Sequence, residues 1–351
     1  NSAFGHYALS ANTTGANNSA FGYNALLANT TGTGNVAVGY AALDAATTAD
    51  YNTALGYAAL GANTTGYSNV MVGANAGDAI TTGPLNVGVG HNALGTVVTG
   101  QENTGIGYNA LSLTTVSDNT GIGAYAGDAL TTGANNTCVG AYSLSAATTG
   151  ASNVMVGAWA GDVLTTGSDN TGIGIHSLGA LTTADYNTAV GSGALLLNTT
   201  GASNTAVGYL ALDANTTAAY NSAFGQNALG ANTTGSPNDA FGFAALGANT
   251  TGASNVAIGA YSLDANTTAS GNTAVGYGTL SQNQTGAQST AVGYAALNQA
   301  LEDNNTAVGY AAMQNCTSGE YNVAVGHAAL DATLTADFNV AVGVSALSTA
   351  T

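Results

Sequence analysis

Histidines, carboxylates and cysteines are the groups of this chain that could carry chemistry. The four histidines are scattered far apart, so no cluster with metal-ligand spacing follows: His6, His91, His176 and His327. Aspartates recur too sparsely for a calcium-binding roll, which needs a Gly-Gly-x-Gly-x-Asp pattern. No Ser-His-Asp or paired-carboxylate arrangement stands out, and without Lys or Arg no cationic side chain would stabilise an oxyanion or a phosphate. We therefore expect a non-enzymatic protein with no metal and no cofactor.

The two cysteines, Cys138 and Cys316, lie in the ninth and nineteenth copies of a repeat described below. Ten copies at the ~4.8 Å spacing of neighbouring strands separate them by about 48 Å. A disulfide needs Cα atoms within ~7 Å. We predict two unpaired, small buried residues.

Composition excludes several partners. The chain has 17 acidic residues and no Lys or Arg, which gives a formal net charge of −17. Nucleic-acid binding and attraction to anionic membranes are therefore not expected, because both need basic side chains. No run of eighteen apolar residues predicts a transmembrane helix, so we expect no membrane insertion in this segment. With 45% hydrophobic and only 5% charged residues, the chain also differs from charge-rich disordered sequences.

An asparagine recurs every seventeen residues from Asn1 to Asn339, in twenty-one copies. Ser289 replaces it once, and two spacings shorten to sixteen residues, at 103–119 and 289–305. A short period kept over a whole chain is typical of a solenoid. We predict an all-β fold, a parallel β-solenoid (β-roll) of about 21 coils with a 17-residue repeat. We interpret residues 1–351 as a single domain and as a segment of a longer chain.

Numbered from its Asn, each coil opens with about six residues that read as a strand, and the coil has room for two or three strands. We expect the apolar fourth place and the mostly leucine ninth place to form the core, for example Val38, Val207 and Val275 with Leu43, Leu212 and Leu280. The fifth place is Gly in every copy, as at Gly5, Gly39, Gly208 and Gly276. This predicts close approach of an opposing strand or of a neighbouring subunit.

Three coils carry Gly instead of Leu at the ninth place. Each of them has an aliphatic residue three positions later, in the pairs Gly77 and Ile80, Gly127 and Leu130, and Gly161 and Leu164. This exchange indicates that the ninth and twelfth places share one core.

Stacked coils turn each place of the repeat into a column. The anchor asparagines predict an internal amide ladder. Asn-Thr-Thr sequons at the twelfth place are candidate glycosylation sites: Asn12, Asn29, Asn63, Asn198, Asn215, Asn232, Asn249 and Asn266. Aliphatic residues at this place in other coils favour the alternative, a partly inward position. A regular threonine array is also compatible with ice binding.

Tyrosines recur at the sixth place, as at Tyr23, Tyr40 and Tyr277, and the ring often moves to the seventh place where the sixth is Ala, as at Tyr125. This pattern predicts packing of coil against coil. The alternative is a surface for sugar stacking or for subunit contact.

The run Asn-(Thr/Ser/Val)-Ala-(Val/Ile)-Gly, as in 204–208 and 255–259, resembles the head repeat of trimeric autotransporter adhesins and repeats of phage tail-fibre and related surface proteins. The resemblance spans essentially the whole chain but concerns a short motif. It implies a parallel β-roll, three chains side by side, and an extracellular adhesive or structural role.

We therefore expect an extracellular or cell-surface structural protein that belongs to a filament or fibre. The alternative is an adhesin head or tail-fibre segment that binds a surface receptor or a glycan. The expected partners are further copies of the chain, which self-assemble with their small-residue faces close together, and glycans, either attached or bound.

Overall fold

Each repeat of the sequence forms one coil with a single short strand. The computed structural model describes residues 1–299, 301–332 and 335–348. The protein is all-β, a parallel β-solenoid with one strand per repeat, and the described residues contain no helix. The fold predicted from the repeat is confirmed.

The sequence predicts one domain over residues 1–351, and the contacts within the structure group the chain into two units, Asn1–Ile175 and His176–Thr351. The first unit contains β1 (Ser2–Phe4), β2 (Ser19–Phe21), β3 (Val36–Val38), β4 (Thr53–Leu55), β5 (Val70–Val72), β6 (Val87–Val89), β7 (Thr104–Ile106), β8 (Thr120–Ile122), β9 (Thr137–Val139), β10 (Val154–Val156) and β11 (Thr171–Ile173). The second contains β12 (Thr188–Val190), β13 (Thr205–Val207), β14 (Ser222–Phe224), β15 (Asn238–Phe241), β16 (Asn255–Ile258), β17 (Thr273–Val275), β18 (Thr290–Val292), β19 (Thr306–Val308), β20 (Val323–Val325) and β21 (Val340–Val342).

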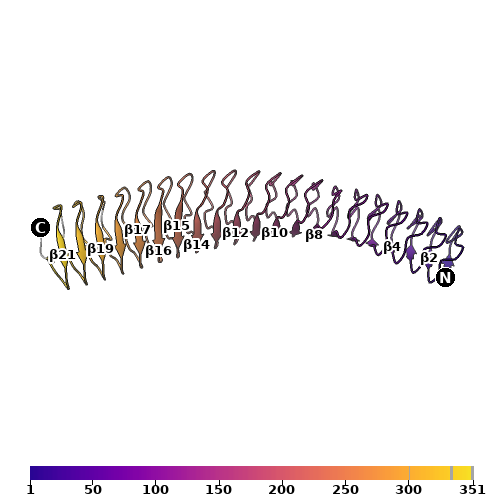
Figure 1. Ribbon diagram of the computed structural model, residues 1–351, viewed down its shortest axis with the longest axis horizontal. Coiled ribbons are helices and arrows are strands. Elements are labelled where there is room, and N and C mark those ends of the chain that lie inside the picture. Colours follow the sequence, from indigo (N-terminus) through magenta and orange to yellow (C-terminus); the bar gives the residue numbers. More distant parts are fainter. Residues whose placement is uncertain (300, 333–334, 349–351) are drawn as a thin grey trace. The chain divides into compact units, whose positions relative to one another are not determined.

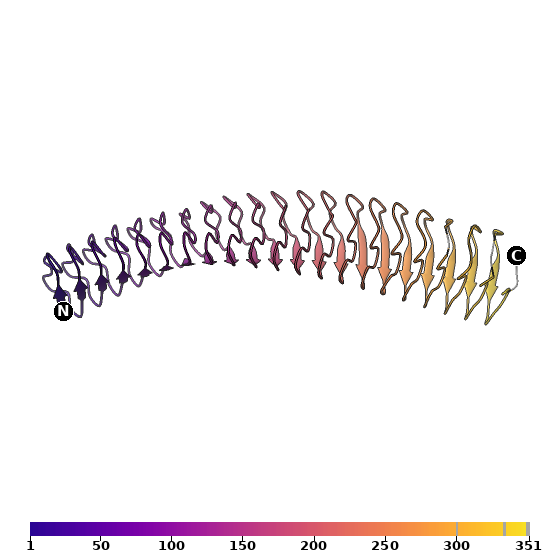
Figure 2. The same ribbon diagram turned by 180° about the vertical axis from the view of Figure 1, so that it is seen from behind.

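Neighbouring strands of each unit are parallel and pair place for place. In the first unit Ala3 is opposite Ala20, and in the second Ala189 is opposite Ala206. In the second unit the strands lie side by side along one edge of the ribbon, with the turns along the other (Figure 1). The coils of the first unit repeat one another in the same way (Figure 2). Equivalent places of successive coils therefore form columns.

The strands are shorter than the sequence predicts, because most contain only the second to fourth places of the coil. The backbone leaves the extended conformation at the fifth place, where Gly39 has a φ of 139°. Left-handed residues follow at the seventh and ninth places, as at Ala41 (φ 51°) and Leu43 (φ 53°). The rest of the coil is a series of turns rather than a second or third strand.

The core contains the third place of each strand, not the fourth. Ala37 and Ala206 are fully buried, whereas Val38, Val207 and Val275 are only half-buried. The prediction that these three valines point inward is wrong, because side chains alternate along a strand and the inward face is taken by the third place. The same alternation leaves the second and fourth places on the outside.

The ninth-place leucines are inside as predicted. Leu43, Leu212 and Leu280 have no exposed surface. They also limit the size of the third-place side chain: a Cβ added to Gly105 would lie 3.1 Å from the side chain of Leu94 in the preceding coil. At Gly105 the interior therefore leaves little room for a larger third-place side chain.

The coils that lack this leucine fill the space in two ways. A Cβ on Gly77 would lie 2.8 Å from Met71 Sδ and 3.0 Å from Ile80 Cδ1. Around Gly161, Met155 fills the same volume. The predicted sharing of one core by the ninth and twelfth places is confirmed, and a large third-place residue also takes part.

The fifth-place glycines mark where successive coils come closest. A Cβ on Gly5 would collide with the carbonyl of Gly22, and Gly39, Gly208 and Gly276 meet the next coil in the same way. Their φ angles of 137–143° also disfavour any other residue. The backbone that approaches is thus the equivalent glycine of the next coil, not an opposing strand and not a neighbouring subunit.

The anchor asparagines form the predicted amide ladder. The backbone N–H of Asn35 donates to Asn18 Oδ1 at 2.9 Å, and Asn35 Nδ2 donates to the same oxygen at 3.2 Å and to Ala49 O at 2.7 Å. At the one exception, the Ser289 hydroxyl accepts from the backbone N–H of Asn305 at 3.2 Å. An anchor such as Asn35 therefore bonds to the coils before and after it and satisfies a turn carbonyl. The ladder is interrupted after Asn221, whose buried Oδ1 has no hydrogen-bond partner.

Neighbouring places in β13 test the corrected orientation. We expect Ala206→Asp to lower the free energy of unfolding by about 3 kcal/mol or more, because it buries an unpaired charge. Val207→Asp should cost only about 1 kcal/mol, because the carboxylate reaches water. Urea unfolding followed by circular dichroism measures both, and equal losses would contradict the orientation.

Candidate functional site

The candidate glycosylation sites form a second amide ladder inside the coil. Asn29 is fully buried, and its Nδ2 donates to Asn12 Oδ1 and to Gly32 O, both at 3.1 Å. Asn215 Nδ2 donates to Asn198 Oδ1 at 3.0 Å. A glycan must be attached to this nitrogen, which has no access to solvent in these residues.

The prediction of glycosylation is therefore wrong for the buried sequons Asn29, Asn63, Asn198, Asn215, Asn232, Asn249 and Asn266. The alternative reading, an inward twelfth place, is confirmed. Asn12 in the first coil is half-buried, and its Nδ2 donates to Gly15 O at 3.1 Å.

The second ladder is interrupted where the twelfth place is not Asn. Asn29 Oδ1 and Asn63 Oδ1 are buried without a hydrogen-bond partner. The next coils have Ala46 and Ile80 at this place, and neither side chain has a donor. Unpaired buried carbonyl groups cost stability, so these are local defects.

Threonines at the thirteenth place also bond between coils. Thr30 Oγ1 donates to Thr47 O at 3.0 Å, and Thr216 Oγ1 donates to Thr233 O at 3.1 Å. The hydroxyl hydrogens of this column are thus used within the protein, which weakens the ice-binding alternative at this place.

Aromatic side chains form rows of rings on the surface, one ring per coil. In the first unit Tyr23, Tyr40 and Tyr57 are stacked with centroids 5.3 Å apart. The predicted packing of coil against coil is confirmed. Tyr40 nevertheless remains 50% exposed, so the row also presents ring surface to solvent.

Histidines are members of these rows. His6 stacks on Tyr23 at 5.2 Å, His91 on Tyr108 at 5.4 Å, and His327 on Tyr310 at 5.0 Å. Across residues 1–299, 301–332 and 335–348, no group of three or more His, Cys, Asp or Glu side chains could hold a metal ion.

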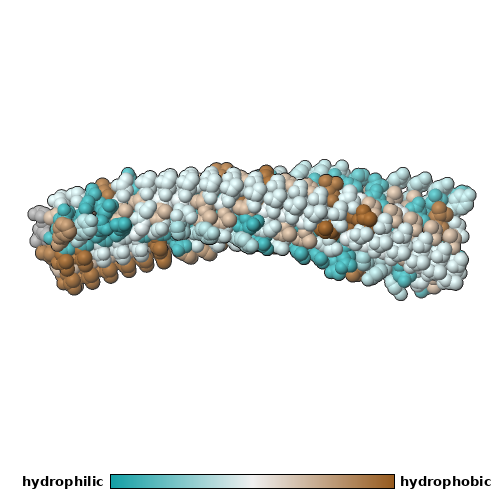
Figure 3. All heavy atoms as spheres, turned by 45° about the horizontal axis from the view of Figure 1, so that its top comes forward, coloured by the Kyte–Doolittle hydropathy of each residue, from teal (hydrophilic) through white to brown (hydrophobic). Residues whose placement is uncertain are grey.

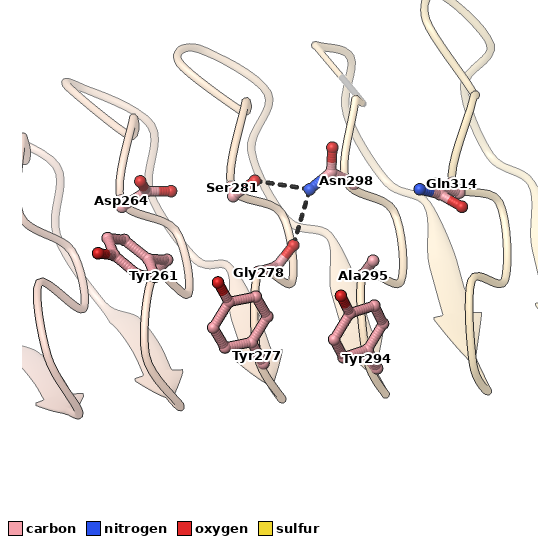
Figure 4. A pocket seen from close by; sticks show the side chains of 9 residues that line it. All are labelled: Tyr261, Asp264, Tyr277, Gly278, Ser281, Tyr294, Ala295, Asn298 and Gln314. Atoms are coloured by element: carbon pink, nitrogen blue, oxygen red, sulfur yellow. Dashed lines mark hydrogen bonds between the residues drawn. The ribbon is translucent and has the colours of Figure 1, made fainter.

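One ring row of the second unit borders a hollow of about 440 Å³, here called the groove. Tyr261, Asp264, Tyr277, Gly278, Ser281, Tyr294, Ala295, Asn298 and Gln314 line it (Figure 4). The side chain of Asn298 extends across part of the groove. Its Nδ2 donates to Gly278 O at 2.9 Å and to Ser281 Oγ at 2.6 Å. Ring faces beside amide, hydroxyl and carboxylate groups can bind a polar ligand that also has an apolar face.

Burial also acts on the acidic side chain of the groove. Desolvation raises the pKa of Asp264 above the usual range, although backbone hydrogen bonds oppose the shift. Asp264 Oδ1 is buried and has no hydrogen-bond partner. This oxygen faces the protein rather than the groove.

The groove is not among the features predicted from the sequence. Its signal is Gly278 at the seventh place, followed in the next coil by the small residue Ala295. Gly193 is also at the seventh place, but there Leu210 of the next coil fills the space. A Cβ on Gly278 would have no neighbour closer than Asn298 Nδ2 at 3.9 Å. The missing side chain leaves space beside the rings.

Both cysteines are free and buried, as predicted. Cys138 is at the third place, and Cys316 replaces the twelfth-place Asn. Burial raises the pKa of Cys138 to about 12 and also raises that of Cys316. Neither thiol is activated.

Comparison with protein-family models and with curated proteins found no match to this chain. In the part of the chain that the structure describes, no helix is long and apolar enough to cross a membrane.

The gap in the second ladder gives a stability prediction. We expect Ala46→Asn to raise the free energy of unfolding by about 1 kcal/mol, because the new amide would donate to Asn29 and accept from Asn63. The control is Ala147→Asn, at the same place between Leu130 and Leu164, where the amide oxygen has no donor and stability should fall. Thermal unfolding of both variants provides the measurement, and a loss of stability in Ala46→Asn would contradict the ladder.

The buried thiol of Cys138 gives a prediction about its reactivity. At pH 8 we expect iodoacetamide to leave Cys138 unmodified in the folded protein and to alkylate it after denaturation in guanidinium, because both the raised pKa and burial suppress the thiolate. Mass spectrometry of the peptide reads the result. Rapid alkylation without denaturant would show that the third place is not buried.

Proposed function

We propose that this chain is a non-enzymatic structural segment of an extracellular or cell-surface fibre, in which copies associate laterally through the outer faces of their strands. The observation that carries the proposal is an apolar surface, here called the outer strip. It consists of the fourth places of the strands in each unit, which are apolar in every coil, flanked by the second places, which are Val in seven coils and Thr, Ser or Asp in the others.

Many fourth-place side chains of the outer strip are large and exposed. Phe21 is 44% exposed, Leu55 46% and Ile258 43%. Over the C-terminal coils such side chains form a continuous apolar row (Figure 3). Extended apolar surfaces of this kind are typical of interaction sites.

A second copy of the chain is the occupant that the strip fits best. Asp239 is the only charged residue at the second and fourth places of β1 to β21, so the net charge of −17 hardly opposes contact along this face. A partner with the same coil spacing would place its own apolar row against each coil in register. The contact face is not the small-residue face expected from the sequence, because the third-place alanines are inside.

The resemblance to adhesin head repeats supports side-by-side association and an extracellular setting. The alternative, an adhesin or tail-fibre segment that binds a receptor or a glycan, is favoured by the exposed ring rows.

Charge placed on the outer strip tests association. We expect the unmodified chain to form multimers in sedimentation velocity, and Ile258→Lys/Val292→Lys to weaken association at least about tenfold, because two charges would be desolvated in the contact. The control is Tyr186→Lys/Tyr220→Lys, which adds the same charge at residues 65% and 69% exposed outside the strip.

The control should associate like the parent, and circular dichroism should show that both variants are folded. An unmodified chain that stays monomeric at high concentration, or equal dissociation of both variants, would exclude lateral association through the strip.

A further inference from the structure

We propose that the groove of the second unit binds a neutral oligosaccharide that lies along the ring row. This binding site is separate from the outer strip and does not depend on association of the chain.

The ring row provides the stacking surface. Tyr277 and Tyr294 have centroids 5.5 Å apart with an angle of 10° between planes, and Tyr294 and Tyr310 have centroids 5.2 Å apart at 7°. Parallel rings in contact are about 3.5–4 Å apart, so rings at these centroid distances are displaced sideways and each leaves part of its face free. Each of the three rings is 51–53% exposed.

The row changes direction at Tyr261. Its ring meets Tyr277 at 5.9 Å with an angle of 79° between planes, so it stands across the end of the parallel series. The surface that a ligand can follow therefore extends from Tyr277 toward Tyr310.

A column of polar side chains runs parallel to the ring row. Asp264, Ser281, Asn298 and Gln314 are the tenth places of four successive coils. Between the two columns lie the small residues Gly278 and Ala295 (Figure 4). One coil thus offers a ring, a small floor residue and a hydrogen-bonding group, and the next coils offer the same set again.

This arrangement matches the chemistry of a sugar chain. The C–H face of a pyranose stacks on an aromatic ring, while its hydroxyl groups donate and accept hydrogen bonds at the edge. Ser281, Asn298 and Gln314 supply the hydroxyl and amide groups at this edge. Successive sugars of a linear chain would contact successive coils.

The negative charge of the chain favours a neutral ligand over an anionic one. The chain has no Lys or Arg, and Asp264 lies in the groove itself, so carboxylated or sulfated sugars and nucleotides would meet repulsion without a compensating cation. A proline-rich peptide is the other ligand known to dock on tyrosine-lined surfaces, but it has few groups for a four-residue polar row.

Calorimetric titration of the full chain tests the site with cellohexaose, chitohexaose and maltohexaose as neutral probes. A sulfated hexasaccharide and a proline-rich peptide serve as comparison ligands. We expect saturable binding of at least one neutral probe, with an affinity that does not change with ionic strength. The sulfated sugar should not bind.

Three variants locate the binding. Tyr277→Ala and Tyr294→Ala should each weaken it at least about tenfold through loss of stacking. Gly278→Leu should abolish it by filling the groove while the rings remain, and the fold should tolerate it because Leu210 holds the same place with a φ of 52°. The control Tyr209→Ala removes a ring that is 54% exposed outside the groove and should bind like the parent.

Absence of binding to all three neutral probes at millimolar concentration would overturn the proposal. So would binding that survives Gly278→Leu, or binding of the peptide alone. Sedimentation of the same samples reports association separately, so failure of this site would not be confused with failure of the outer strip.

Discussion

The close contact between successive coils is the constraint on which the rest of the structure depends. At the fifth place the backbones meet so closely that a single methyl group would collide, and at the first place an asparagine bonds to the coils above and below. Within each unit, these two columns fix the register of one coil on the next. Once the register is fixed, equivalent residues must lie over one another, and ladders of amides and rows of rings follow from the repeat itself. Glycine supplies the approach and asparagine supplies the bonds that make it stable.

The same stacking accounts for an unusual backbone. Ninth-place leucines such as Leu43 have a φ near +53°, a conformation that costs a bulky residue about 1–3 kcal/mol. Leu43 remains in it because its N–H donates to Ala59 O of the next coil at 3.0 Å and its side chain is completely buried. Left-handed residues turn the chain sharply enough to close a coil of seventeen residues around an interior only a few side chains wide. The narrow interior in turn explains why Ala is sufficient at the third place and why Met71 is accepted only beside Gly77.

Periodicity alone was enough to predict the solenoid, the parallel stacking and the anchor ladder, because each is a property of the column rather than of one residue. Orientation within the strand was not predictable in this way. Large residues such as Val207 are usually core residues, and only the size of the interior shows that Ala206 is inside. The pairs Met71 with Gly77 and Met155 with Gly161 contained the missing signal, since a large third-place residue coincides with a lost ninth-place side chain. The prediction of glycosylation failed for a related reason. Asn-Thr-Thr is typical of exposed loops, but in this protein the coil turns the asparagine of the twelfth place inward.

A repeat of this kind makes function depend on the outward columns, because the inward ones are used for stacking. Two outward columns differ in chemistry. The outer strip has an apolar side chain at the fourth place of every coil and almost no charge, which suits contact with an identical surface. The ring row near Tyr277 instead lies beside polar groups and the small residue Gly278. The strip recurs in each coil, so in the proposed association its contribution would grow with the number of coils. The groove instead depends on a local combination, Gly278 at the seventh place and the small Ala295 in the next coil, whereas at Gly193 the side chain of Leu210 fills the corresponding space. Under these two proposals, uniform columns would serve assembly, and the recognition site would lie where the residues of one coil leave space beside the rings.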